Sequence, residues 1–520
     1  MFKPKSPTAI PDFYKGKSVF VTGGSGFVGK VLVEKLLRSC PDIKTIYMLI
    51  RPKKSATVEQ RLEQIKGNVL FSVLKEAQPK ALDKLVPVAG DITKIGLDLS
   101  EQDRAMLVKT ATIVFHVAAS VRFDDFLQAA VFTNLRSTRE TVRLVEQLKQ
   151  VDAFVHVSTA YSNCERKFVE EAFYPGKWDW REAIEVAERM EPEHRLVCER
   201  ISAKFVEPMP NTYVFTKGLA ECLVKDLCSG KFPTCVVRPS IVTACIDEPL
   251  TGYLDNFSGS TSLLVAGGTG VARVIKADPN GINDNVFCDN VAKALIMASW
   301  ETAMRKTTDD IKVYNVTSDL TCTSRELVDI GERILPHYPN RYYIAPMNIG
   351  LVKSDYGFYF VNLFCHFFPS LFIDLILKLA GIKVSILRLR RKLVTACLAL
   401  EPFSVPRGGS WTFVHDNYVE LEKSLVDSDR AAFSYSFRCK NKKEMSEAFT
   451  RMIIHCKQYL FEYERGEQNL DARRALYAKV KIAYQSVQAL AVMYVVYLLV
   501  WKTSIPAMFF GRYYNYLVNV

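Results

Sequence analysis

The chain has 520 residues, of which 49% are hydrophobic and 24% charged, without an excess of glycine or proline. This length predicts roughly two to four structural units with sizeable cores, and the composition excludes extended disorder. The formal net charge is +12, but acidic residues are interleaved with the lysines and arginines. Because no basic stripe forms, nucleic acid is not an expected partner.

Cysteine usage and the first residues indicate the compartment. The 13 cysteines form no Cys-x-x-Cys pair and no Cys/His spacing typical of zinc. Reduced thiols are therefore expected, and no metal site is predicted. The N-terminal residues carry no apolar segment of signal-peptide length, so the first domain is expected in the cytosol.

Short β-branched segments alternate with longer amphipathic segments as far as about Leu320. Helices are expected at Gly29–Arg38 and Thr133–Leu148, among others. Such alternation predicts an α/β fold with a Rossmann-type, doubly wound parallel sheet. The candidate strands are Ser18–Val21, Thr45–Ile50, Leu85–Ala89, Thr112–His116, Ala153–Val157 and Thr234–Arg238.

A glycine-rich turn follows the first candidate strand and opens the first helix. Gly23, Gly26 and Gly29 satisfy G-x-x-G-x-x-G, while Gly24, Gly26 and Gly29 satisfy G-x-G-x-x-G. Such glycines let the backbone approach a pyrophosphate, and the helix N-terminus attracts the anion. The turn therefore predicts a dinucleotide site. Its expected lining is Gly23, Gly24, Ser25, Gly26, Phe27, Val28 and Gly29.

The second candidate strand is followed by Arg51, Lys53 and Lys54. An NAD enzyme usually has an acidic residue here, which binds the ribose 2′-hydroxyl. Cations suit a 2′-phosphate instead, through charge-assisted hydrogen bonds. The pattern favours NADPH, with Arg51 as the principal ligand and Lys53 or Lys54 assisting. A solvated basic turn is the alternative.

Residues after the later strands are expected to line the same crevice, because parallel strands bind ligands at their carboxyl ends. Asp91 and Ile92 are expected near the adenine, and Ala118 near the middle of the cofactor. Pro239 and Ile241 are expected beside the nicotinamide.

Tyr213 and Lys217 are four residues apart, hence on one face of a predicted helix. A tyrosine with the reference pKa of about 10 is a weak acid–base catalyst at neutral pH. A nearby ammonium lowers that pKa and can also hold ribose hydroxyls. The pair therefore predicts a catalytic unit.

The fifth strand ends in two hydroxyl residues, Ser158 and Thr159. Thr159 is the preferred hydrogen-bond partner of a substrate carbonyl, and Ser158 is the alternative, because a one-residue register decides which faces inward. Asn134 is a candidate for holding a proton-relay water, although helix-surface polarity explains it equally well.

Beyond about Tyr343 the pattern changes. Gly357–Ala380 is rich in Phe, Leu and Ile but contains His366, Pro369 and Asp374. It is therefore expected to lie in a membrane interface or to line an entrance for a lipid chain, rather than to span a bilayer. An ordinary pair of core helices is the alternative.

An uncharged apolar segment near the end, Ile482–Trp501, has the length of a membrane span. It predicts a single C-terminal span. The cations before it keep the catalytic domain on the cytosolic side by the positive-inside rule. These cations are Arg473, Arg474, Lys479 and Lys481.

With these motifs, the chain resembles the animal fatty acyl-CoA reductases, a branch of the extended short-chain dehydrogenases. The resemblance implies a reductase domain at residues 1–345, a helical C-terminal domain at 346–465 and a membrane anchor region at 466–520. The matching segments are Gly16–Gly29, Lys35–Asp42, Leu49–Lys54, His116–Phe123, His156–Tyr161, Asn211–Lys217 and Val237–Ile241.

The resemblance also implies the reaction. Long-chain acyl-CoA would be reduced through an aldehyde to a primary alcohol for ether lipids and waxes, with two NADPH consumed and CoA released. Tyr213 would donate the proton, Lys217 would tune Tyr213 and hold the ribose, and Thr159 or Ser158 would bind the oxyanion. The implied partners are the acyl-CoA and membrane lipid, at the peroxisome or endoplasmic reticulum. The sequence is compatible with a homo-oligomer.

Two other interpretations use the same residues. A sterol or other lipid dehydrogenase, or a sugar-nucleotide epimerase, would use the same Tyr213 and Lys217, but the apolar second half favours a lipid substrate. A catalytically silent, membrane-bound lipid-binding scaffold is the other interpretation. The complete set of glycines and the Thr159, Tyr213 and Lys217 triad argue against a silent protein.

Overall fold

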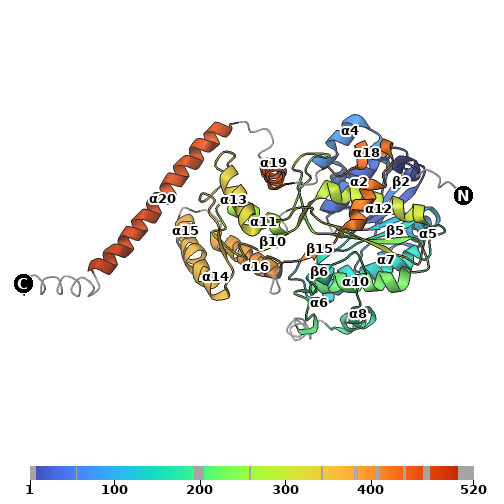
Figure 1. Cartoon of the computed structure of the whole chain (residues 1–520), viewed down its shortest axis with the longest axis horizontal. Helices are drawn as coiled ribbons and strands as arrows, with labels where there is room; N and C mark the ends of the chain where they lie inside the picture. The colour runs from blue at the N-terminus through green and yellow to red at the C-terminus, as the bar shows by residue number, and fades with distance from the viewer. Residues whose placement is uncertain are drawn as a thin grey trace, which may run out of the picture.

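The computed structural model describes residues 8–53, 55–176, 178–191, 204–256, 259–340, 343–379, 381, 385–405, 410–436, 441–460 and 469–501. Seven strands form one parallel sheet in the order β12-β7-β5-β4-β1-β2-β3. Figure 1 labels β2 and β5 of this sheet. The order reverses between β1 and β4, and α/β sheets bind ligands at such a reversal. The strands are β1 (Ser18–Thr22), β2 (Thr45–Ile50), β3 (Leu85–Ala89), β4 (Ile113–His116), β5 (Ala153–Val157), β7 (Thr234–Pro239) and β12 (Lys312–Val316).

The predicted doubly wound sheet is confirmed, and the six candidate strands match observed strands to within a residue at either end. The seventh strand, β12, was not among them. Its Lys-Val-Tyr-Asn-Val sequence is β-prone, but it lies in a polar stretch. It is placed in the sheet by parallel pairing with β7, in which Tyr314 lies beside Val237.

Side chains alternate between two cores across the sheet, as the two-residue period of a strand requires. Val19 and Val21 of β1 face one core, which is covered by α2 (Phe27–Ser39) and α12 (Cys288–Arg305). Phe20 faces the other, covered by α5 (Glu101–Thr110), α7 (Ser137–Val145) and α10 (Thr212–Cys228). Burial on both faces explains why these strands are almost wholly apolar.

Shorter elements connect this framework. The helix expected at Thr133–Leu148 is observed as a π-helical turn (Val131–Arg136) followed by α7, and α6 (Leu127–Ala130) directly precedes it. The others are α1 (Ile10–Tyr14), α3 (Val58–Lys66), α4 (Ser72–Ala77), α8 (Trp180–Arg189), α11 (Gly259–Gly268), α13 (Ser324–Ile334), β6 (Phe168–Val169), β8 (Ile241–Thr243), β9 (Val274–Lys276), β10 (Ile282–Asn283), β11 (Asn285–Phe287), β13 (Cys322–Thr323) and β14 (Gly350–Val352).

The C-terminal part of the chain is mainly helical, and some of it packs against the N-terminal half. β15 (Thr412–Phe413) pairs with β6, and the Asp429 carboxylate accepts the backbone N–H of Ile10 at 2.7 Å. The division at residues 345 and 465 stays a prediction. The helices are α14 (Asp355–Asn362), a π-helical turn (Leu363–Phe367), α15 (Phe368–Leu379), α16 (Ile386–Ser404), α17 (Asp416–Lys423), α18 (Asp427–Phe433), α19 (Lys442–Leu460) and α20 (Leu470–Trp501).

The position predicted for the membrane span is corrected. Ile482–Trp501 does form the second half of α20, which projects from the body (Figure 1). Among the described residues, however, the helix with both the length and the apolar composition of a span is internal, at Asp355–Leu379. The sequence placed the span later because Asp374 and His366 interrupt the internal run.

Tertiary partners account for those polar residues. The His366 ring accepts the Arg273 backbone N–H at 2.8 Å, and Asp374 accepts the backbone N–H of Ile386 at 2.6 Å. The polar groups face the protein, so the opposite face of the helix stays apolar.

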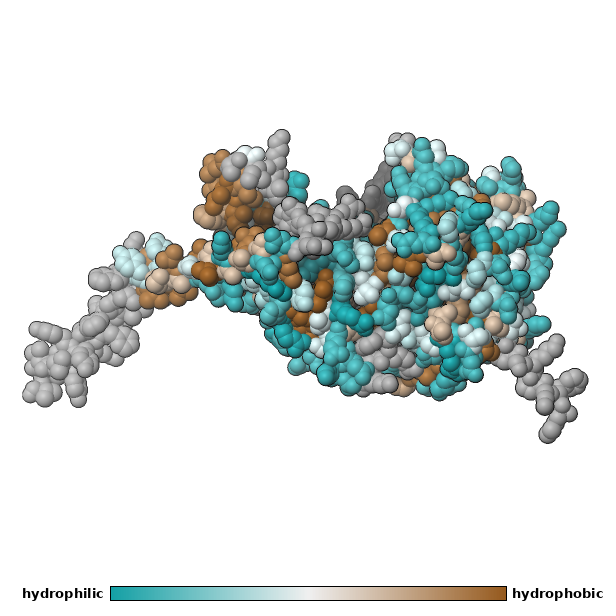
Figure 2. Space-filling view, turned by 90° about the horizontal axis from the view of Figure 1, so that it is seen from above, coloured by the Kyte–Doolittle hydropathy of each residue, from teal (hydrophilic) through white to brown (hydrophobic). Residues whose placement is uncertain are grey.

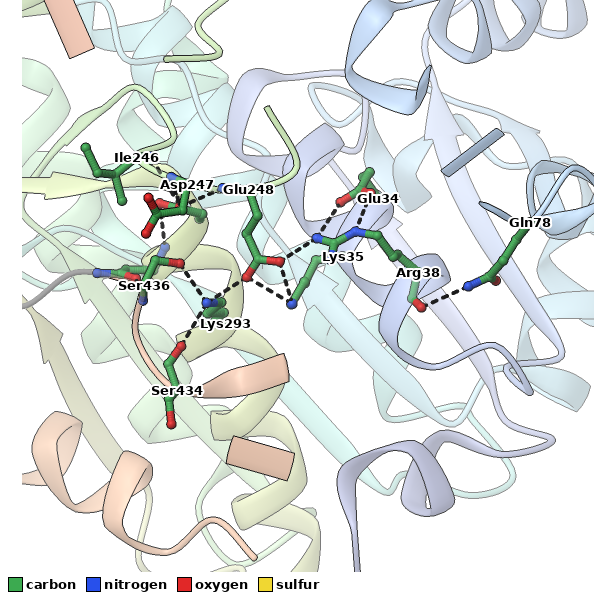
Figure 3. A network of polar contacts seen from close by, with 12 residues as sticks. Glu34, Lys35, Arg38, Gln78, Ile246, Asp247, Glu248, Lys293, Ser434 and Ser436 are labelled. Atoms are coloured by element: carbon green, nitrogen blue, oxygen red, sulfur yellow. Dashed lines mark hydrogen bonds and ion pairs between the residues drawn. The ribbon is translucent and has the colours of Figure 1, made fainter. Parts of the chain in front are cut away.

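A buried ionic network joins the first helix of the sheet to later parts of the chain (Figure 3). The Glu248 carboxylate lies 2.9 Å from the Lys35 ammonium of α2 and 2.6 Å from the Lys293 ammonium of α12, and Arg38 contacts it at 2.7 Å. Lys293 also donates to the carbonyl oxygen of Ser434. One carboxylate thus links α2, α12 and the C-terminal chain.

We expect Glu248→Ala to lower the free energy of unfolding by about 3 kcal/mol, because the nearly buried ammonium groups of Lys35 and Lys293 lose their counter-ion. Burial raises the pKa of Glu248, but Lys35 and Lys293 outweigh it and lower that pKa to about 2. This stabilisation is therefore present above about pH 4.3, the pKa in the unfolded chain, and is lost as the pH falls toward 2.

Urea unfolding of both proteins at several pH values measures this difference. The control is Glu420→Ala, which removes an exposed pair with Lys423 and should change stability by less than about 0.5 kcal/mol. Equal effects of the two substitutions would contradict the role of the network.

Candidate active site

The glycine turn occupies the point where the strand order reverses. Gly23 has a φ of +75°, and a β-carbon there would lie 2.5 Å from the backbone nitrogen of Ala118. A β-carbon at Gly29 would lie 2.2 Å from the carbonyl oxygen of Gly23. At Gly24 it would meet only the flexible end of Met48. The contacts therefore favour the Gly23, Gly26 and Gly29 pattern.

Two adjoining cavities, of about 510 and 470 Å³, form one cleft along this turn. Both are lined by Gly23, Ser25, Ile92 and Ala118. The larger continues past Gly26, Phe27, Val28, Gly29 and Ile241 to Tyr213 and Thr159. An open helix N-terminus beside side-chain-free backbone fits the pyrophosphate of a dinucleotide. The cleft thus has the form of a nicotinamide-cofactor site.

The smaller cavity is basic where the sequence places the ribose. Arg51 and Asp91 both line it, with 4.0 Å between the guanidinium and the carboxylate. Arg61 of α3 also lines it and donates to the Arg51 carbonyl oxygen. The backbone of Lys53 forms an isolated β-bridge with that of Ala56, and Lys53 does not line the cavity. Lys54 lies outside the described residues.

Tyr213 lies in the first turn of α10, whose N-terminus is capped by the Asn211 side chain. Its ring lines the larger cavity together with Thr159. Burial raises the pKa of Tyr213 to about 12, and a hydrogen bond with the Thr159 side chain opposes the rise. The tyrosine is therefore a neutral phenol at physiological pH, able to donate a proton into the cavity.

Lys217 lies one turn further along α10 and is 1% exposed. Its ammonium donates to the Val157 carbonyl oxygen at 2.5 Å. Burial lowers the pKa of Lys217 to about 8, although the Glu221 carboxylate opposes the fall. Lys217 thus sits behind the cavity wall, on the same helix face as Tyr213.

The sequence left open whether Ser158 or Thr159 faces the cavity, and the end of β5 answers this. Thr159 faces the cavity, whereas the Ser158 hydroxyl is 2.5 Å from a carboxylate oxygen of Glu221, away from it. Asn134 lies in the π-helical turn, is 1% exposed and donates to the Thr216 hydroxyl at 3.1 Å. Of the two hydroxyl residues at the end of β5, Thr159 is thus the one that lines the cavity.

Aromatic side chains enclose the Tyr213 end of the cavity. Phe123 contacts the Tyr213 ring edge-on at 5.4 Å, and Phe403 lies 5.2 Å from Phe123 and 5.1 Å from Tyr161. Phe403 and Leu400, which also lines the cavity, belong to α16. Sequence reasoning did not select these residues, because nothing local shows that the end of α16 reaches the cavity.

The cleft collects most of the residues predicted for it. Gly24, Pro239, Ser158 and Lys217 lie behind its surface. Arg61 is a further cation that the sequence analysis missed; its place on a helix just after Arg51 was the available signal. The predicted residues that line one or both cavities are Gly23, Ser25, Gly26, Phe27, Val28, Gly29, Arg51, Asp91, Ile92, Ala118, Thr159, Tyr213 and Ile241.

Known structures show the same fold. The terminal R domain of the myxalamid PKS-NRPS pathway matches with a TM-score of 0.56 at 18% identity, covering 87% of this chain and 92% of that domain. The R domain of a nonribosomal peptide synthetase from Mycobacterium tuberculosis matches with a TM-score of 0.54 at 17% identity, covering 86% and 93%.

Sequence comparisons are more specific. A nucleotide-binding family model described as male sterility protein matches residues 21–295, and a second model of that description matches 365–462. Fatty acyl-CoA reductase 1 of Rattus norvegicus is 34% identical, with 83% of this chain and 82% of that protein covered. Fatty acyl-CoA reductase 2 of Homo sapiens is 32% identical, covering 88% and 87%. This chain, with its nicotinamide-cofactor cleft, belongs to the fatty acyl-CoA reductase family.

Proposed function

We propose that this protein is an alcohol-forming fatty acyl-CoA reductase that uses NADPH. The observation that carries the proposal is the pairing of Tyr213 with Thr159 in a largely apolar cavity continuous with the glycine turn. Phe123, Phe403 and Leu400 surround this pair with apolar surface suited to an acyl chain. A sugar nucleotide would need polar partners there.

The residues divide the chemistry between them. The Thr159 and Tyr213 hydroxyls bind the thioester carbonyl oxygen and stabilise the charge that develops on it. A bound NADPH would supply the hydride to the carbonyl carbon. Tyr213 protonates the oxygen, and the resulting hemithioacetal expels CoA as its thiol and leaves an aldehyde. The same residues serve a second reduction, from aldehyde to primary alcohol.

The test is turnover of palmitoyl-CoA by the full chain in detergent. We expect two NADPH oxidised for each thiol released, with hexadecanol as the product. Oxidation of NADPH without thiol release, or reduction of a sterol ketone in place of the thioester, would contradict the proposal.

Tyr213→Phe in the same assay should lower kcat by at least about 100-fold, because only the transferable proton is lost. The fold and NADPH binding should be retained. The matched control is Tyr174→Phe, whose hydroxyl only accepts the Glu170 backbone N–H outside the cleft. Near-normal turnover of Tyr213→Phe would end the assignment.

We propose NADPH in preference to NADH because Arg51 and Arg61 line the ribose end of the cleft. Arg51→Asp should weaken NADPH binding by roughly 10- to 100-fold, the loss of one charge-assisted hydrogen bond. NADH binding should change little. Fluorescence titration with both cofactors measures this, with Lys53→Ala as control; equal losses for NADPH and NADH would show that Arg51 is structural.

We also propose that the α14–α15 unit lies in a membrane. Only 11% of the most apolar part of Asp355–Leu379 is buried. Its exposed side chains lie at the end of the molecule from which α20 also projects, and Figure 2 shows strongly hydrophobic surface there. The α14–α15 side chains are Tyr359, Phe360, Leu363, Phe364, Phe367, Phe368, Leu371, Phe372, Leu375, Ile376 and Leu379.

The first turns of α20 are attached to the body, since the Arg474 guanidinium donates to the His337 carbonyl oxygen at 2.8 Å. Further along α20, the Tyr484 ring lies 4.9 Å from the Arg273 guanidinium. The cations of α20 precede its apolar half and favour a cytosolic catalytic domain. We propose the peroxisomal or endoplasmic-reticulum membrane as its location.

A chain ending at Ala472 should stay on membranes through a carbonate wash, because α14–α15 is intact. Adding Phe364→Glu and Phe372→Glu should release it. Each buried phenylalanine contributes about 2 kcal/mol, so the partition coefficient should fall on the order of a thousandfold. Vesicle sedimentation measures this, with exposed Ile95→Glu as control. Release of the shortened chain without these substitutions would contradict the proposal.

A further inference from the structure

Two side chains of α10 hold the carboxyl end of β5. The Lys217 ammonium donates to the Val157 carbonyl oxygen at 2.5 Å, and the Ser158 hydroxyl is 2.5 Å from an oxygen of Glu221. Lys217 and Glu221 are four residues apart, hence neighbours on one helix face. The residues they contact are consecutive, so the two contacts together set the register of Thr159.

Glu221 is itself held from the neighbouring strand. The Arg238 guanidinium of β7 donates to both of its carboxylate oxygens, at 2.9 and 2.7 Å. The remaining Arg238 donors bind the carbonyl oxygens of Glu170 and Ala172 at 3.0 and 2.9 Å. Both side chains of the pair are buried, at 0% and 3% exposed. The carboxylate therefore cannot turn toward solvent.

The groups around Lys217 come from four elements. His116 of β4 and His156 of β5 stack at 5.5 Å, and burial lowers the pKa of each, that of His116 to about 3. Both rings are uncharged at neutral pH. Arg238 of β7 is paired with Glu221, and Tyr213 of α10 is a neutral phenol. Glu221 is thus the anion among the groups facing the ammonium.

We propose that Glu221 is a positioning residue for the reaction, acting through its neighbours on β5 and α10. It holds the Ser158 hydroxyl away from the cavity, so that Thr159 faces Tyr213. It also supplies the counter-charge that keeps the Lys217 ammonium protonated behind the cavity wall. The inference rests on the proposed reductase function but concerns a residue outside the cleft.

The direction of the pH effect follows from the charge. Lys217 is protonated below its pKa, which burial lowers to about 8 and Glu221 raises in opposition. Without the carboxylate that pKa falls further. Lys217 would then lose its proton at a lower pH, and NADPH affinity and kcat would decline at that lower pH.

The test is Glu221→Gln in the full chain, with two readouts across pH 6 to 10. NADPH affinity and kcat with palmitoyl-CoA should both decline on the alkaline side, with midpoints about one pH unit or more below those of the unsubstituted chain. Turnover at neutral pH should fall about tenfold and partly recover toward pH 6. Affinity for NADPH needs no acyl-CoA, so this readout stands even if the chain reduces another substrate.

Two further variants separate charge from structure. Ser158→Ala removes one hydrogen bond but keeps the carboxylate, so its alkaline midpoint should stay in place. Glu221→Gln with Arg238→Met leaves no unpaired buried guanidinium and should shift the midpoint in the same direction as Glu221→Gln. Folded variants lacking Glu221 whose alkaline midpoints do not move, even with reduced thermal stability, would overturn the proposal.

Discussion

The close approach of β1 to β4 is the constraint on which the site depends. At Gly23 the backbone passes so near Ala118 that a β-carbon would lie 2.5 Å from a main-chain nitrogen. This contact lets α2 begin directly at the point where the strand order reverses, with its N-terminus open to the cleft. The carboxyl ends of β2, β3, β5 and β7 then surround the same position, and their following residues become the cleft wall.

Electrostatics organise the chemistry in two layers. The inner layer consists of the neutral Tyr213 and Thr159, which line the larger cavity. Behind them lie charged groups that the cleft does not expose: Lys217, Glu221 and Arg238. Burial of this second layer makes each charge depend on its partner, since an unpaired ion there is strongly disfavoured. Such a layer holds the hydroxyls in place without admitting water.

The second half of the chain adds side chains to the cavity wall of the reductase domain, and it also forms the helical region beyond that domain. Leu400 and Phe403 of α16 cover the substrate end of the cavity, while Arg390 of the same helix donates to Ser370 of α15 at 2.8 Å. One helix therefore connects the apolar surface of α14–α15 with the cavity that Tyr213 lines.

Local sequence determined much of this protein. Strand periodicity, glycine spacing and the four-residue separation of Tyr213 and Lys217 are short-range properties. The sheet, the glycine turn and the shared helix face of Tyr213 and Lys217 were therefore predictable. The family motifs pointed to the fatty acyl-CoA reductases, which the sequence comparisons confirm.

Tertiary structure alone decided what depends on distant partners. A one-residue register at the end of β5 depends on contacts with α10 and β7, so only the fold shows that Thr159 and not Ser158 faces the cavity. Phe403 reaches the cleft because the C-terminal end of α16 packs against its rim. The sequence did not single out Asp355–Leu379 as a span, because its polar residues have their partners elsewhere in the fold. His366 accepts from Arg273, which is remote in the chain, and Asp374 accepts from Ile386, which lies in another helix. Polar residues interrupt an apolar pattern in sequence, whereas in space they can all face the protein.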